Sequence, residues 1–205
     1  MAARYATPSH PLAPWAEVVP DAPYPMTVDA LLTWSDDDRY RYEVVEGVLV
    51  RMAGTRPPAG RATRRLFRPL DAYVEAHALG TVTLPDEVYD FERTGQPNTG
   101  LLPDLGFYPH TRDALIDPRH ALPFAPDLAV EVAGSSRKQA DMDAKARRYL
   151  AAGTALVWVF WPERQRVDVW PYDGCAPVAT LASSEMLDGR DVVPGFTHPV
   201  ADIFA

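Results

Sequence analysis

A charged residue inside an apolar run constrains this chain more than any other feature. Residues 127–133 read DLAVEVA. Alternation along a β-strand places Glu131 on a face that it shares with small alanine side chains, while leucine and valines occupy the other face. A carboxylate in such a strand loses hydration worth several kcal/mol unless it is paired, protonated or bound to a metal. The fold must therefore contain a buried strand and supply a partner for Glu131.

Strand and helix patterns alternate along the rest of the chain. Strands are predicted at residues 81–91, 101–109 and 127–133, as a hairpin at 41–52 that turns at Glu46-Gly47, and as a pair around the turn 162–165. Helices are predicted at 28–34 after the capping residue Thr27, at 61–79 and 137–152, and at the terminal turn 200–204, with Pro69 expected to kink or split the second helix. This order predicts an α/β (α+β) fold with a mixed central β-sheet flanked by helices.

The chain length favours one ordinary domain with an appendage. The 205 residues fit a single domain, and six of the 21 prolines fall within the first 25 residues. Proline disfavours helix and has no N–H to donate in a β-sheet. Residues 1–25 are therefore predicted to form an extended arm and residues 26–205 the folded domain. Trp15 and Tyr24 of the arm are candidates to pack onto the body or onto a partner.

The charge balance limits the kind of partner. A net charge of −8 argues against a protein that coats nucleic acid through bulk positive charge. The region from Arg51 to Arg68 nevertheless holds six arginines and no acidic residue. Four of them follow the spacing of one helical face, namely Arg61, Arg64, Arg65 and Arg68. This stripe predicts contacts to nucleic-acid phosphates, with a solvated helix face as the alternative.

Several other classes of protein are disfavoured by what the sequence lacks. It has no apolar run long enough for a bilayer span, and its start is proline-punctuated where a secretory signal needs an apolar run, so we expect a cytoplasmic protein with no membrane partner. One cysteine, Cys175, cannot form an internal disulfide. The five histidines show no zinc-ligand spacing, and no glycine-rich phosphate loop occurs.

A second acid repeats the setting of Glu131. Asp104 lies two residues before Gly106 in a segment that we predict to be a strand, so open space is expected beside it. Two carboxylates on adjacent strands repel each other unless a hard divalent cation accepts both, and Mg²⁺ is the expected ion, with Mn²⁺ as a substitute. Lys145, on the helix after the Glu131 strand, can reach back to such a site; the alternative is a surface pair with Asp141, four residues earlier.

An ordered set of motifs resembles the Uma family of restriction endonucleases, within the PD-(D/E)XK nuclease superfamily. The set covers about residues 26–204 and comprises Tyr42–Gly47, Pro103–Leu105, Pro126–Val132, Ser135-Ser136 with Asp141, Lys145 and Tyr149, and the hairpin at 156–170. The resemblance implies a restriction-endonuclease-like core, DNA as substrate and Mg²⁺ as cofactor. It implies catalytic roles for Asp104, Glu131 and Lys145, with Glu43 as an additional metal ligand.

One position departs from the superfamily pattern. The lysine expected two residues after the acid of the third strand is replaced by Ala133, and the resemblance makes Lys145 its substitute. We therefore expect an Mg²⁺-dependent endonuclease that hydrolyses phosphodiester bonds in DNA. The alternatives are a relative of weak or no activity that binds nucleic acid or a protein, and a structural protein that forms a homodimer through its aromatic C-terminal sheet.

Overall fold

A mixed six-stranded sheet forms the centre of the computed structural model, which describes residues 13–34, 37, 39–54, 56–172, 174 and 176–205 and therefore not Cys175. Its strand order is β11 (Ala179–Ala182), β10 (Arg166–Pro171), β9 (Leu156–Trp161), β8 (Leu128–Val132), β7 (Leu105–Pro109) and β4 (Gly80–Thr83). Strands β8 and β9 run parallel and the other neighbours antiparallel. The predicted mixed central sheet is confirmed.

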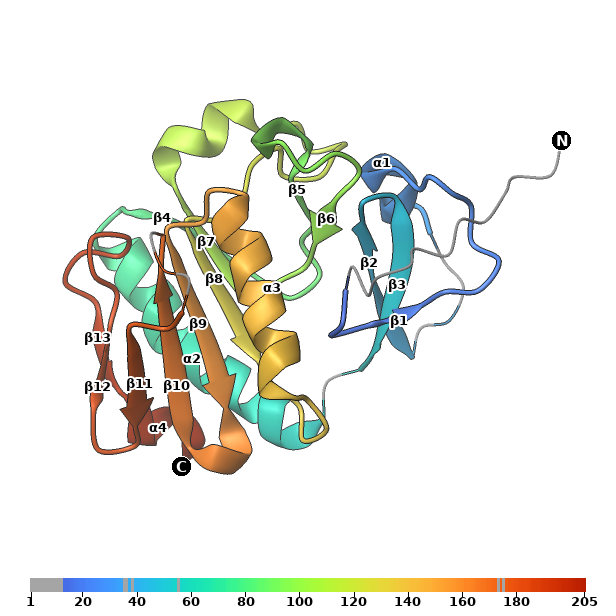
Figure 1. Cartoon of the computed structure of the whole chain (residues 1–205). Helices are drawn as coiled ribbons and strands as arrows, with labels where there is room; N and C mark the ends of the chain where they lie inside the picture. The colour runs from blue at the N-terminus through green and yellow to red at the C-terminus, as the bar shows by residue number, and fades with distance from the viewer. Residues whose placement is uncertain (1–12, 35–36, 38, 55, 173, 175) are drawn as a thin grey trace, which may run out of the picture.

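Helices cover both faces of this sheet. Figure 1 shows α3 (Gln139–Ala151) in front of it and α2 (Pro57–Ala76) behind it. The alternation predicted for β8 is confirmed, because Val130 packs into the core on the α2 side and Ala129 into the core with α3. Glu131, two residues after Ala129, shares its face and therefore faces α3. The last helix, α4 (Val200–Phe204), joins the α2 core through Val200 and Ile203.

A second, five-stranded sheet packs beside α3 (Figure 1). Its order is β1 (Glu17–Val18), β3 (Val48–Ala53), β2 (Tyr40–Val45), β6 (Gly100–Leu101) and β5 (Tyr89–Asp90). The predicted hairpin is confirmed: β2 and β3 join at Glu46 and Gly47, whose φ angles of 52° and 79° suit a tight two-residue turn. The short helix α1 (Val28–Leu32) follows Thr27, whose hydroxyl accepts the Ala30 N–H as predicted.

Two predicted strands are each divided between the sheets. Residues 81–91 contain the end of β4 and then β5, and residues 101–109 contain the end of β6 and then β7. Pro85 and Pro103 lie at the two crossings, where a residue without an N–H cannot continue a ladder. Asp104 therefore precedes β7 instead of lying on one continuous strand with Leu101, which corrects the prediction.

Helix α2 begins earlier than predicted. Pro57 and Pro58 form its first turn, where their missing N–H groups cost no helical hydrogen bond. It ends at Ala76, before the predicted end at residue 79, and Gly80 begins β4. The helix also runs through Pro69 without a break, so the predicted splitting is wrong. Helix α3 ends at Ala151, close to the predicted end at residue 152, and Gly153 follows with a φ of 97°.

The remaining elements complete the chain. They are the hairpin of β12 (Met186–Asp188) and β13 (Thr197–Pro199) and the short 3₁₀ turns η1 (Glu92–Thr94), η2 (His110–Leu115) and η3 (Pro162–Arg164). The described part of the arm packs onto the body: Trp15 is 1% exposed, and β1 pairs with β3. Tyr24 stays 40% exposed. Among the helices of the described ranges, none has the length and hydropathy to cross a membrane.

Candidate active site

Two acidic side chains meet where β7 begins beside β8. Leu105 pairs with Val130 in this antiparallel ladder, so the next residues outward, Asp104 and Glu131, lie opposite each other. The backbone N–H of Asp104 donates to the Val130 carbonyl at 2.9 Å, and the Val132 N–H donates to Oδ2 of Asp104 at 2.8 Å. Both acids are buried, with 7% and 5% of their surface exposed. The register thus brings together the two acids that sequence reasoning paired.

Lys145 supplies the positive charge that Glu131 requires. It projects from α3 and is 2% exposed, with Nζ 2.9 Å from Oε1 of Glu131. One helical turn later, the Tyr149 hydroxyl donates to the same oxygen at 2.8 Å. The alternative of a surface pair with Asp141 is wrong, because Asp141 instead accepts the Lys138 N–H at the start of α3. Lys145 belongs to the buried acidic cluster.

Glu43 of β2 holds Lys145 from the other sheet. Its Oε1 lies 3.0 Å from Lys145 Nζ and accepts the Leu102 N–H at 3.0 Å, while its Oε2 accepts the indole N–H of Trp15 at 2.9 Å. Glu43 is fully buried and takes no part in lining the cavity described below. These surroundings argue against the expected metal-ligand role and suit a residue that positions Lys145.

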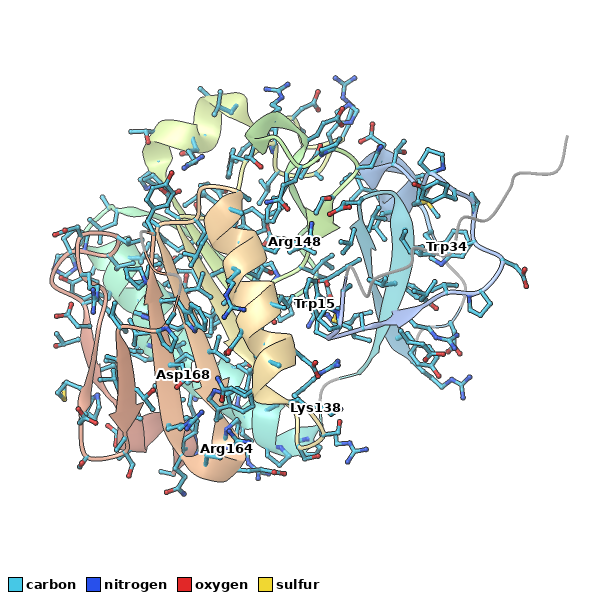
Figure 2. The ribbon with its side chains drawn as sticks, viewed as in Figure 1. Trp15, Trp34, Lys138, Arg148, Arg164 and Asp168 are labelled. Carbon is cyan, nitrogen blue, oxygen red and sulfur yellow. The ribbon has the colours of Figure 1, made fainter. Side chains whose placement is uncertain are left out.

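Sequence reasoning missed two residues of the site, Arg41 and Trp15. Arg41 Nη1 donates to Oδ1 of Asp104 at 2.8 Å, and its Nη2 donates to the carbonyls of Pro85 and of Leu102, the latter at 3.2 Å. A signal existed for Arg41, since it lies two residues before Glu43 and so shares its face of β2. Trp15 offered no comparable signal, because it comes from the proline-rich arm. Figure 2 shows Trp15 between the second sheet and α3.

A cavity of about 120 Å³ opens onto this cluster. Asp104, Glu131 and Lys145 all line it, so the three predicted catalytic residues share one opening. Its basic lining residues are Arg41, Arg56, Arg137 and Lys145. A cavity with acids inside and several cations around them suits a ligand that carries a phosphate and a metal ion together.

Burial and charge set the protonation of the cluster. Burial raises the pKa of Glu131 to about 7, against the opposing effect of Lys145. Burial would lower the pKa of Lys145, but the charges of Glu131 and Glu43 hold it above its ordinary value. Burial and the nearby Glu131 raise the pKa of Tyr149 well above its ordinary value. Lys145 therefore stays charged at neutral pH and Tyr149 stays a hydrogen-bond donor.

The donor set fits Mg²⁺ and does not fit a metal that needs a full protein cage. Within the described ranges no cluster of three or more histidine, cysteine or acidic side chains could hold a metal. Mg²⁺ uses one or two carboxylates and keeps several waters, which Asp104 and Glu131 with the cavity beside them can provide. Oε2 of Glu131 accepts no hydrogen bond from the part of the chain that the structure describes.

Open space lies beside Asp104 as expected, but Gly106 does not provide it. A Cβ added at Gly106 would lie 2.3 Å from the hydroxyl oxygen of Tyr89 and 2.5 Å from that of Thr83. These two hydroxyls hydrogen-bond to each other at 2.7 Å over the glycine. Gly106 therefore makes room for a core tyrosine, Tyr89.

The arginine stripe lies on the outer face of α2. The buried face of this helix is formed by Ala59, Ala62, Leu66, Leu70 and Val74. On the opposite face, Arg61, Arg64 and Arg68 are exposed and Arg65 is half-buried. None of the four forms an ion pair with a residue in the described ranges. Their charges are therefore available to an anionic partner.

Comparisons with known proteins identify a family and a similar fold. A family model described as "Uma2: Putative restriction endonuclease" matches residues 28–201. Among solved structures, a protein from Anabaena variabilis titled "putative nuclease belonging to DUF820" superposes with a TM-score of 0.70. It is 16% identical, and the match covers 88% of this chain and 98% of that one. A search of curated proteins finds no match. The structural likeness confirms the restriction-endonuclease-like fold expected from the sequence.

Proposed function

Because the chain belongs to the Uma2 family, whose model spans residues 28–201, we propose that it is an endonuclease that hydrolyses phosphodiester bonds in DNA with the help of Mg²⁺. One observation carries the proposal. Asp104 and Glu131 lie opposite each other on a cavity that also receives the ammonium of Lys145. Paired acids on neighbouring strands with an adjacent lysine form a site suited to phosphodiester hydrolysis.

The reaction needs water, a phosphodiester and charge stabilisation. The water oxygen forms a bond to phosphorus while the ester P–O bond breaks, and a proton from the water ends on the leaving oxygen, which gives a phosphate monoester and an alcohol. A bound Mg²⁺, held by Asp104 and Glu131, would lower the pKa of a water and neutralise charge on the phosphoryl oxygens. Mn²⁺ has similar ligand preferences and is the expected substitute.

The protein's own cations assist from fixed positions. Lys145 is held by Glu43 and Glu131, so its ammonium needs no reorganisation when negative charge grows on the phosphoryl group. Arg41 is held by Asp104 and the Pro85 carbonyl beside the same cavity. Lys145 thus takes the electrostatic role that the superfamily pattern gives to the position of Ala133.

The outer surface supports a nucleic-acid substrate. Arg56 lines the cavity and lies just before α2, whose outer face carries the four-arginine stripe. Phosphates of a strand whose scissile bond is in the cavity can continue along these arginines. DNA is the substrate that the restriction-endonuclease family description favours.

The ion pair of Arg41 with Asp104 favours a second candidate function. An acid already neutralised by arginine at 2.8 Å has less need of a cation. A nuclease fold in which Arg41 stays in place would bind nucleic acid through its arginines and not cut it. This binding module is the alternative that the experiment must separate from the enzyme.

Metal titration and cleavage separate the two. For the enzyme, we expect Mg²⁺ or Mn²⁺ to bind by calorimetry and to support nicking of plasmid DNA. Asp104→Asn and Glu131→Gln should each lose about a hundredfold or more of the rate and weaken metal binding. Asp127→Asn is the matched control, because this acid precedes β8 and pairs with Arg112 away from the cavity.

Two outcomes would contradict the enzyme. Metal-dependent nicking that persists unchanged in Glu131→Gln would overturn the assigned site. DNA binding without metal binding or cleavage would support the binding module.

A further inference from the structure

A second cavity of about 270 Å³ lies beside the first. It opens between the first half of α2 and the loop that follows β4. Its lining includes Arg64 and Phe67 of α2, Leu84 and Pro85 of that loop, and Asp104 and Leu105. None of the predicted site residues except Asp104 and Arg64 belongs to it, and its size leaves room for a flat ring system.

The two cavities share a wall. Asp104 lines both of them. Arg41, which lines the first cavity, donates through Nη2 to the carbonyl of Pro85, which lines the second. Asp104 and the Arg41–Pro85 contact thus separate the two cavities. A ligand group in the second cavity would be the neighbour of a phosphate in the first.

The chemistry of the second cavity combines apolar walls with one cation at its edge. Phe67, Leu84 and Leu105 provide an aromatic ring and two aliphatic side chains. Leu84, directly after β4, keeps 50% of its surface exposed. Arg64 belongs to the stripe and forms no ion pair within the described residues. A nucleotide matches this combination, because its base is flat and largely apolar on its faces and its phosphate is anionic.

We propose that the second cavity binds one unpaired nucleobase of the nucleotide next to the scissile phosphate, with Arg64 on that nucleotide's own phosphate. This inference rests on the proposed nuclease function and adds a substrate class to it. A base that is stacked and paired in a duplex cannot enter a cavity walled by α2 and the loop at Leu84. The substrate is therefore single-stranded DNA or a duplex opened at the cleavage point.

The experiment places one abasic residue in a single-stranded oligonucleotide and maps the cleavage positions with Mg²⁺ present. We expect cleavage of the phosphodiester beside the abasic residue to fall about tenfold relative to the same position with a base, which is the scale of one lost stacking contact. In Leu84→Ala, which alters the wall against the base, this difference should shrink to less than about twofold. Arg64→Gln should instead slow cleavage at normal and abasic positions alike, because both keep the phosphate that Arg64 binds. Cleavage of a fully paired duplex should be at least about tenfold slower than that of the single strand.

A matched control is available on the surface. Leu115→Ala alters another exposed leucine, 53% exposed on η2, and should keep the full abasic effect. Thermal unfolding of both leucine variants checks that the fold is intact. Equal cleavage at abasic and normal positions, or a duplex cut as fast as the single strand, would overturn the base-binding cavity and leave the nuclease standing. Absence of any metal-dependent cleavage in the wild-type protein would instead contradict the proposed function itself.

Discussion

Lys145 Nζ lies 3.0 Å from Oε1 of Glu43, so one ammonium joins helix α3 to a strand of the second sheet. The same ammonium also reaches Glu131 of the central sheet at 2.9 Å. One lysine therefore connects three layers of the fold. Its removal should affect stability as well as activity.

Lys145→Met should unfold more readily than the wild type. Deleting one partner of a buried ion pair costs roughly 3–5 kcal/mol, because the remaining charges are left uncompensated. Urea unfolding measures this loss, and DNA cleavage should disappear with it. The chain has only one other lysine, Lys138, which is exposed and directly precedes α3. Lys138→Met should stay within about 0.5 kcal/mol of the wild type; similar losses in both variants would refute the special role of Lys145.

Trp15→Phe should destabilise the chain by about 1–3 kcal/mol. It removes the indole donor to Oε2 of Glu43 and leaves a buried carboxylate oxygen unsatisfied. Trp34→Phe is the control, since the buried indole N–H of Trp34 has no hydrogen-bond partner among the residues that the structure describes. Chemical denaturation compares the two variants. A larger loss in the Trp34 variant would contradict the assigned contact of Trp15 with Glu43.

The stability of the metal-free protein should depend on the protonation of Glu131. Its folded pKa of about 7 is above the ordinary value of 4.5, so the folded state binds the proton more tightly than the unfolded state. The resulting stabilisation is complete below pH 4.5 and is lost as the pH rises through about 7. Measured with a chelator present, the free energy of unfolding of the wild type minus that of Glu131→Gln should fall by about 3 kcal/mol across this window. A difference that rises with pH would mean that Lys145 dominates over burial.

The arginine stripe should determine the salt dependence of DNA binding. Replacing Arg64 and Arg65 by glutamine should weaken binding and reduce the slope of log K against log salt by about one to two units, for two phosphate contacts. Fluorescence anisotropy across a salt series provides this slope. The double variant Arg39→Gln and Arg119→Gln is the control, because it removes the same number of charges. These two arginines already pair with Asp37 and Asp117 and lie outside the stripe. An equal change of slope in the control would show that only net charge matters.

Much of the fold followed from local patterns in the sequence. Period-2 alternation identified the two faces of β8, and the glutamate-glycine turn identified the β2–β3 hairpin, because both depend on neighbours along the chain. The family resemblance drawn from the order of the motifs is confirmed. The division of residues 81–91 and 101–109 between two sheets was not predicted. Each half has a strand pattern, and only tertiary pairing decides which sheet it joins.

The site was predicted only in part, because local patterns report near neighbours along the chain and not distant contacts. Glu131 and Lys145 are linked by the short connection between a strand and its following helix, so their approach was foreseeable. Trp15 contacts Glu43 across 28 positions, and Arg41 contacts Asp104 across 63. No local periodicity carries such long-range information. The expected metal role of Glu43 depended on chemistry alone, and the burial that argues against it became visible only in three dimensions.

The bridging position of Lys145 makes the buried cluster depend on the assembly of both sheets. A chain that has formed only the larger sheet and α3 already brings Glu131 and Lys145 together, yet Glu43 and Arg41 arrive with the smaller sheet. A half-built intermediate would hold an unrestrained ammonium beside one acid and leave Asp104 without its guanidinium partner. The buried cluster is therefore complete only when the smaller sheet has packed against the larger sheet and α3.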